Sequence, residues 1–274
     1  ISKEEASSPT GYTEAVIVTA VIDAKERRDV ATVDIPNAFC QTVIAEEDAE
    51  HRVIVRLRGP VVEILCEIAP EVYLDYVTTN KKGEKVLLVQ CMNALYGSMI
   101  ASVLFYKKLV LSLTNNGFKL NPYDPCVANK TTDNGKQLTV VWHVDDLMAT
   151  CEDDFELTKF SCYLGRIYGP KLSMHTGRKH DYLGVDLEFT DEDTLEVSMF
   201  KYLRDVIKEF PEKITGRAAT PAAGHLFEVR DEKEAKLLEE ERALAFHHTV
   251  AQLLFMATRA RRDIQTAVAF LTTR

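Results

Sequence analysis

The chain has 274 residues and a mass of 30.9 kDa, enough to bury a substantial core in one large domain or two small ones. Its net charge of −9 and pI near 5.4 argue against binding of nucleic acid by the whole surface, but leave room for a local basic groove. No apolar run approaches the roughly 20 residues of a membrane-spanning helix, and the first residues lack the pattern of a signal peptide, so we expect an intracellular, cytoplasmic protein.

In the first half of the chain, apolar periodicity predicts three helices and three strands. The helices are expected over residues 12–25, over residues 61–68 after a proline, and over residues 100–113, with Gly117 as a stop signal. The strands are expected over residues 30–33, 53–57 and 85–90. The first of these strands leads directly into Asp34.

The middle of the chain predicts two successive hairpins. Residues 126–130 and 138–144 are extended runs on either side of the Asp-Asn-Gly sequence at 133–135, which is a strong tight-turn signal. The second run leads into Asp145 and Asp146, after which apolar residues resume. Two adjacent carboxylates between apolar strand segments indicate the tip of the second hairpin.

The last part of the chain changes from mixed to helical character. Asp153 can cap a helix over residues 155–167, and three further elements follow: a strand pair at 182–189 and 195–199 and a helix at 202–210. A linker rich in Ala, Thr, Pro and Gly at 218–231 precedes a helical pattern over 232–273. We therefore expect an α+β chain with a mixed body at 1–215 and a helical segment at 216–274.

The adjacent Asp145 and Asp146 are candidates for metal binding. Like charges at contact distance are unfavourable without a cation, although two aspartates can also serve simply as an exposed turn. Asp34 adds a third carboxylate at the end of another strand. Three carboxylates on adjacent strands can hold two divalent ions roughly 3.5–4 Å apart, which is the arrangement used for nucleotidyl transfer, and Mg²⁺ suits such oxygen ligands.

Five segments in order resemble the successive motifs of the copia-type (Pseudoviridae) retrotransposon reverse transcriptases. The segments are VDIPNAF, ALYG before a helix, HVDDL, DYLGVDLEF and HHTVAQLLFMATRARRDIQTAV. They are similar to the family's DVKNAF, ALYGLKQAPRAWY, YVDDL, FLGIEI and Y-x-x-x-V-G-x-L-x-Y-x-x-x-T-R-P-D-I. The resemblance extends from about residue 29 to the end of the chain.

The resemblance implies a reverse-transcriptase hand and an RNA-directed DNA polymerase that extends a primer 3′ end. An antiparallel palm sheet backed by helices would carry the site, with partial fingers before it and a helical thumb or connection after it. The implied partners are an RNA or DNA template with its primer and deoxynucleoside triphosphates, in a virus-like particle. The implied site residues are the metal ligands Asp34, Asp145 and Asp146 with two Mg²⁺ ions (or Mn²⁺ as a substitute), Phe39 at the nucleotide, and Tyr182, Leu183 and Gly184 as a primer grip.

The chain departs from the family in three places. The family's tyrosine before Val-Asp-Asp is His143 here, and the basic residues expected after ALYG are replaced by SMIASV. The basic fingers segment has no counterpart in residues 1–29, and no segment after Arg274 corresponds to the family's RNase H domain. Since the chain also begins with Ile1 and ends within a helix-like pattern, we expect a segment of a longer polyprotein that is incomplete as an isolated enzyme.

Several alternatives stay open from the sequence. Phe39 and Gly184 could be ordinary packing and strand residues, and His247-His248 is better explained as a structural pair than as a metal site because no third ligand is evident. The arginines at 259, 261 and 262 could contact a nucleic-acid backbone or simply be exposed. The whole protein could be a catalytically dead remnant that binds nucleic acid, or an interaction domain in which the acidic pair is only a turn.

Overall fold

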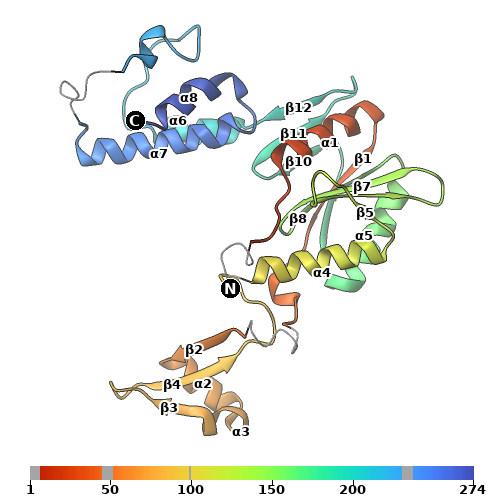
Figure 1. Ribbon diagram of the computed structural model, residues 1–274, viewed down its shortest axis with the longest axis vertical. Helices are drawn as coiled ribbons and strands as arrows, with labels where there is room; N and C mark the ends of the chain where they lie inside the picture. Colours follow the sequence, from red (N-terminus) through yellow and green to blue (C-terminus); the bar gives the residue numbers. More distant parts are fainter. Residues whose placement is uncertain (1–6, 45–51, 99, 230–236) are drawn as a thin grey trace. The chain divides into compact units, whose positions relative to one another are not determined.

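The computed structural model describes residues 7–44, 52–98, 100–229 and 237–274 (Figure 1). The chain forms two compact units, Ile1–Thr19 with Arg28–Thr176 and Ala20–Arg27 with Gly177–Arg274. Helix α1 (Thr13–Glu26) begins in the first unit and ends in the second. The main boundary between the two units lies after Thr176. The assignment of residues 1–215 to palm and fingers and of residues 216–274 to a thumb stays a prediction. No helix within the described ranges combines the length and apolarity needed to cross a bilayer.

The first unit contains a six-stranded sheet in which every neighbouring pair is antiparallel. Its strands, in spatial order, are β5 (Lys119–Leu120), β6 (Val127–Thr131), β7 (Gln137–His143), β8 (Asp146–Cys151), β1 (Asp29–Asp34) and β9 (Ser173–Thr176). The expected α+β class with an antiparallel sheet is thus confirmed. Strands β5 and β9 were not predicted, since neither carries enough alternating residues to give a period.

Two helices share one hydrophobic core with this sheet. Helix α4 (Ala101–Asn115) contributes Phe105 and Leu109, and α5 (Asp154–Tyr168) contributes Phe160 and Leu164, all almost fully buried. The Asp153 carboxylate accepts a hydrogen bond from the Phe155 amide at 3.0 Å, which confirms the predicted N-cap of α5. Residues 138–142 of β7 are all buried, so both faces of the central strands are covered. This explains why β7 reads as a continuous apolar run rather than an alternating one.

A smaller sheet lies in the segment between β1 and α4. It has the order β2 (Ile54–Arg58), β4 (Lys85–Gln90), β3 (Val77–Thr79), and three short helical segments accompany it: α2 (Pro60–Ile68), α3 (Pro70–Tyr73) and η3 (Leu74–Tyr76). Strand β2 and helix α2 were predicted to within one residue. Strand β3 was missed because three residues carry too little periodicity to be recognised.

The second unit combines a three-stranded sheet with helices. The strands are β10 (Lys179–Tyr182), β11 (Val185–Phe189) and β12 (Leu195–Ser198), and the helices are α6 (Phe200–Glu209), α7 (Glu240–Ala257) and α8 (Gln265–Leu271), with 3-10 turns η4 (Gly224–Phe227) and η5 (Arg262–Ile264). The prediction of one strand over residues 182–189 is wrong. Tyr182 pairs with Val185, and Leu183 (φ 55°) and Gly184 (φ 76°) form a two-residue hairpin turn between β10 and β11. The linker and helix predicted at 218–231 and 232–273 fall partly on residues 230–236, outside the described ranges.

The segment before α1 is held closely against the central sheet. The Asp124 carboxylate accepts hydrogen bonds from the amides of Tyr12 (3.1 Å) and Cys126 (2.8 Å). A Cβ atom at Gly11 would lie 2.5 Å from the carbonyl oxygen of Trp142, which is far inside van der Waals contact. Only glycine therefore allows this backbone to approach the end of β7.

Gly11→Ala is expected to lower the free energy of unfolding by about 1–3 kcal/mol, the usual cost of overpacking a tight contact. Chemical denaturation of the two proteins measures the difference. Gly165→Ala is the matched control, because Gly165 lies inside α5 with no atom near its Cβ position. There the same change should stabilise by about 0.5–1 kcal/mol through helix propensity. Equal effects of the two substitutions would contradict the close approach at Gly11.

Candidate active site

The turn between β7 and β8 has an unusual backbone. His143 pairs with Asp146 across the hairpin, so Val144 and Asp145 are the two turn residues. Val144 has a φ of 60°, a conformation that is rare for a β-branched residue and that hairpins usually assign to Gly or Asn. Local strain of this kind is concentrated at functional sites. The β7–β8 pairing confirms the hairpin predicted from the Asp-Asp sequence. Its turn is strained at Val144, which the sequence did not indicate.

Asp34 lies directly beside this turn. It is the last residue of β1, and it stands opposite Asp146 in the antiparallel β1–β8 ladder. Side chains at directly opposed positions share a face, with Cβ atoms about 4.5–5.5 Å apart, and like charges placed there repel each other. The buried residues of β1 end at Val33, so both carboxylates emerge at the exposed edge of the core.

Tyr96 joins the carboxylates from the loop before α4. Partial burial raises the pKa of the Tyr96 hydroxyl most, and the negative charges of Asp145 and Asp34 raise it further, with a contribution from the Cys40 thiol between them. The charges of Asp145 and Asp34 both reach this hydroxyl, so Tyr96 lies in the neighbourhood of the two carboxylates. The ALYG motif was recognised from the sequence without a role for its tyrosine, and an aromatic residue inside that motif was the available signal.

Phe39 packs against Tyr96 on one side and against the core on the other. Its ring lies 4.7 Å from that of Tyr96 and 5.9 Å from that of Phe105, measured between centroids. It belongs to a short 3-10 turn, η1 (Phe39–Gln41), and is half-buried. The packing alternative for Phe39 therefore has support, and its contact with an incoming nucleotide stays a prediction.

Hydrogen bonds tie the two segments that carry these aromatic rings. The Asn93 side-chain amide donates to the Cys40 carbonyl at 2.6 Å, and the Ala94 amide donates to the Thr42 carbonyl at 2.8 Å. The Lys108 amine of α4 donates to the Gln41 carbonyl at 2.7 Å. The loop with Phe39 and the loop with Tyr96 are thus held together, and the first of them is also tied to the middle of α4.

The donor chemistry of the site fits divalent cations. Carboxylate oxygens on adjacent strands are the ligands that Mg²⁺ prefers, and Asp34 and Asp146 already occupy opposed backbone positions. Among the described residues, no three Asp, Glu, His or Cys side chains are close enough to enclose an ion. The strand register places Asp34 opposite Asp146, and Asp145 is the adjoining turn residue. The assignment of Asp34, Asp145 and Asp146 as metal ligands stays a prediction.

His143, which replaces the family's tyrosine, is anchored by the segment before α1. Its Nδ1 lies 3.3 Å from the Gly11 carbonyl oxygen, and since a carbonyl only accepts, the ring donates through Nδ1–H. The Gly11 carbonyl thus orients the imidazole at the first position before the turn. This contact links the close approach at Gly11 to the geometry of the carboxylate hairpin.

The predicted primer grip lies in the second unit. Tyr182 is buried, Leu183 is half-buried, and the missing Cβ of Gly184 would lie 3.6 Å from the Phe255 ring. Gly184 is therefore a turn glycine with a positive φ, and the alternative of a strand glycine is wrong. Contact of these residues with a primer strand stays a prediction.

The C-terminal basic cluster is largely used within the chain. The Arg259 guanidinium stacks on Phe255 at 3.7 Å from the ring centroid, and burial lowers its pKa. Arg261 forms a two-bond ion pair with Asp263, at 2.7 and 2.8 Å. His248 lies on the exposed side of α7, with its Nε2 3.9 Å from a Glu209 carboxylate oxygen. These contacts favour structural roles for the cluster.

Comparisons with known proteins leave the sequence without a family assignment. No family model and no curated protein matches the chain. Among solved structures, one match is a telomerase from Candida Tropicalis in a complex with a TWJ fragment of telomeric RNA, with 13% sequence identity and a TM-score of 0.39. The match covers 96% of this chain and 41% of the telomerase chain, so the chain spans less than half of that protein.

Proposed function

We propose that this chain is the polymerase core of a copia-type retrotransposon reverse transcriptase. The observation that carries the proposal is the register that sets Asp34 opposite Asp146, with Asp145 in the adjoining strained turn. The order of the five sequence motifs supports the same function. The reaction would be template-directed addition of deoxynucleotides to a primer 3′ end.

In this proposal Asp34, Asp145 and Asp146 would hold two Mg²⁺ ions. When bound, such ions activate an attacking hydroxyl and neutralise charge on the transferring phosphate. The carboxylates position the site and are kept at one edge of the sheet by the β1–β8 and β7–β8 ladders. The rings of Phe39 and Tyr96, which are tilted by 46° with centroids 4.7 Å apart, would offer an apolar surface for the sugar or base of an incoming deoxynucleotide.

A basic face on the small sheet supports a nucleic-acid partner. Arg56 and Arg58 are exposed at alternate positions of the edge strand β2, and Arg52 continues the same alternation just before it. None of the three has a hydrogen-bond or ion-pair partner in the part of the chain that the structure describes, unlike Arg261. Three unpaired guanidinium groups on one face can bind phosphates despite the net charge of −9.

The proposal is tested by primer extension on RNA and DNA templates with Mg²⁺, with Mn²⁺, and with a chelator. Extension that depends on template and metal supports a reverse transcriptase. Carboxylate-dependent metal affinity without extension would instead identify a remnant that no longer polymerises. If neither extension nor metal affinity is found, the acidic pair is only a turn and the polymerase assignment is wrong.

Arg56→Gln with Arg58→Gln is expected to weaken binding of a template–primer duplex. Loss of two phosphate contacts should reduce the slope of log K against log salt by about two, since each contact contributes roughly 0.9. Fluorescence anisotropy at several salt concentrations measures the slope. The matched control is Lys201→Gln with Arg204→Gln, two exposed cations on α6. An equal change in the two doubly substituted proteins would show that only net charge matters.

A further inference from the structure

The turn that carries Phe39 is capped by hydrogen bonds at every carbonyl. The turn comprises η1 and the residue that follows it, residues 39–42, and each of its carbonyl groups accepts a hydrogen bond. In chain order, the donors are the Thr42 amide (2.9 Å), the Asn93 side-chain amide (2.6 Å), the Lys108 amine (2.7 Å) and the Ala94 amide (2.8 Å). Carbonyls at the end of a helical turn find no partner within it, so groups elsewhere must satisfy them. The two side-chain donors lie 53 and 67 residues further along the chain, so tertiary structure fixes this turn.

Lys108 is an unusual donor for this role. It projects from the middle of α4, and its amine also lies 5.0 Å from the centroid of the Tyr168 ring. Its side chain is half-buried, and burial lowers the pKa of the amine. No carboxylate of the described residues forms an ion pair with it. A cation that gives up water for a neutral carbonyl and a ring gains little stability, so the contact indicates a role beyond holding the fold.

Gln41 connects the Lys108 amine to the start of the loop that contains this turn, residues 35–42. The Gln41 side-chain amide donates to the Pro36 carbonyl at 2.7 Å, and its backbone amide donates to the Asn37 carbonyl at 3.2 Å. Pro36 is only two residues after Asp34, the last residue of β1. The chain therefore leaves β1, turns through the loop and returns onto its own beginning. Lys108 holds the returning end of this loop in place.

Helix α4 thus holds the loop at two points. Phe105 and Lys108 are three residues apart, so their side chains lie on the same side of the helix. Phe105 contacts the Phe39 ring, at 5.9 Å between centroids, and Lys108 holds the Gln41 carbonyl. Packing determines how deeply the Phe39 ring is buried. The hydrogen bond, which is directional, determines the position of the backbone from which that ring projects.

We propose that Lys108 positions the incoming deoxynucleotide indirectly, by fixing the loop that sets the Phe39 ring under the sugar. The proposal rests on the reverse-transcriptase function proposed above. Without the Lys108 hydrogen bond the ring would no longer be held at one height, and a displacement of about 1 Å is enough to weaken a contact with substrate. The carboxylates should be unaffected, because a strand ladder holds Asp34 opposite Asp146. Loss of the bond should therefore raise the KM for deoxynucleotide rather than lower kcat.

Lys108→Met tests the loop without any need for activity. Methionine keeps an unbranched side chain beside Tyr168 and removes only the donor, and water can replace the amine at the half-buried Gln41. Amide hydrogen exchange in the intact chain should become at least about fivefold faster at Gln41 and Thr42, whose bonds close the turn, while the melting temperature stays near that of the wild type. Lys107→Met, at the exposed neighbouring position of α4, should leave both unchanged. Lys108→Arg retains a donor and should restore slow exchange.

Single-nucleotide extension then measures the effect on substrate. Lys108→Met should raise the KM for deoxynucleotide about tenfold and keep kcat within about twofold, whereas a merely destabilised enzyme loses active molecules, which lowers kcat at an unchanged KM. Lys108→Arg should bring the KM back toward the wild-type value, and Lys107→Met should not alter it.

Unchanged amide exchange, an unchanged KM in an active enzyme, or an equal effect of Lys107→Met overturns the proposal and leaves the polymerase function standing. Absence of extension by the wild-type chain overturns the nucleotide role together with the polymerase. Faster exchange in Lys108→Met would in that case show a brace of the fold alone.

Discussion

Asp145→Asn is expected to reduce primer extension by at least about a thousandfold while leaving the protein folded. The substitution keeps the size of the side chain and removes the charge that would hold a metal ion and stabilise the transferring phosphate. Because Asp145 lies in the turn outside the core, no packing is lost. Thermal melting alongside primer extension separates loss of activity from unfolding.

Matched substitutions make this result specific. Asp34→Asn should abolish extension as well, and it should leave the melting temperature unchanged or raise it, since it relieves repulsion with the opposed Asp146. Asp205→Asn, at an exposed position of α6, should extend primers at the wild-type rate. Wild-type extension by either active-site variant would refute the metal assignment.

Manganese provides a readout that does not depend on activity. A paramagnetic ion held by Asp34 and Asp145 should broaden the NMR signal of labelled Tyr96, whose hydroxyl senses both carboxylates. In Asp145→Asn the broadening should be lost at the same manganese concentration. Unchanged broadening would place the ion elsewhere.

Phe39→Val is expected to raise the ratio of ribonucleotide to deoxynucleotide incorporation by roughly a hundredfold, at about 1.4 kcal/mol per tenfold. If the Phe39 ring lies under the incoming sugar, it occupies the space of a 2′-hydroxyl, and valine opens that space. All three carboxylates stay in place, so deoxynucleotide use should fall only modestly. Single-nucleotide extension with matched dNTP and rNTP measures the ratio.

The packing alternative gives a different result in the same experiment. Phe39 also contacts Phe105, so its truncation leaves a cavity that costs on the order of 1–3 kcal/mol of stability. If packing is its only role, both nucleotide classes suffer equally and the ratio is unchanged. Phe105→Val is the control. Phe105 is 1% exposed within the core, so its truncation should lower the free energy of unfolding without altering the ratio of ribonucleotide to deoxynucleotide incorporation.

Much of the candidate site could be predicted from local sequence. The β6–β7 hairpin follows from the Asp-Asn-Gly turn, and α5 follows from its helical period and the Asp153 cap. The β7–β8 hairpin follows from two carboxylates between apolar runs. Each of these signals extends over only a few neighbouring residues, so backbone preference and the spacing of apolar side chains determine the local structure directly.

Other elements carried no such signal. The Leu183-Gly184 turn lacks the usual Asn-Gly or Asp-Gly pair, so its two strands read as one continuous run. Strands β3 and β9 have three and four residues, and they are recognised only through their partners β4 and β1. The residues of β9 pair with a strand far away in sequence, which no local period encodes.

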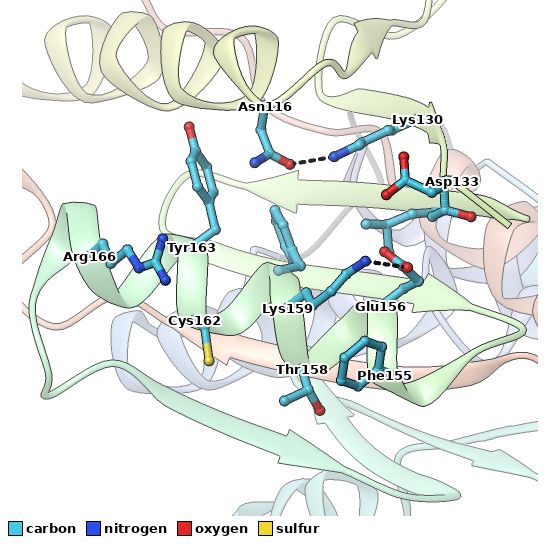
Figure 2. A pocket seen from close by; sticks show the side chains of 13 residues that line it. Asn116, Lys130, Asp133, Phe155, Glu156, Thr158, Lys159, Cys162, Tyr163 and Arg166 are labelled. Carbon is cyan, nitrogen blue, oxygen red and sulfur yellow. Dashed lines mark hydrogen bonds and ion pairs between the residues drawn. The ribbon is translucent and has the colours of Figure 1, made fainter.

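The sequence by itself determined most of the longer helices and strands and that the aspartates stand at strand ends, because hydrophobic period and turn chemistry are local properties of the chain. Only the tertiary structure decided that Asp34 lies opposite Asp146 and that the charges of Asp34 and Asp145 both act on the Tyr96 hydroxyl. A pocket beside α5 is likewise lined by residues of β6, β7 and α5 and of the segments that follow α4 and β6 (Figure 2). These relations depend on which faces the strands and helices bury against one another, and that choice is made by packing of the whole core rather than by any single segment.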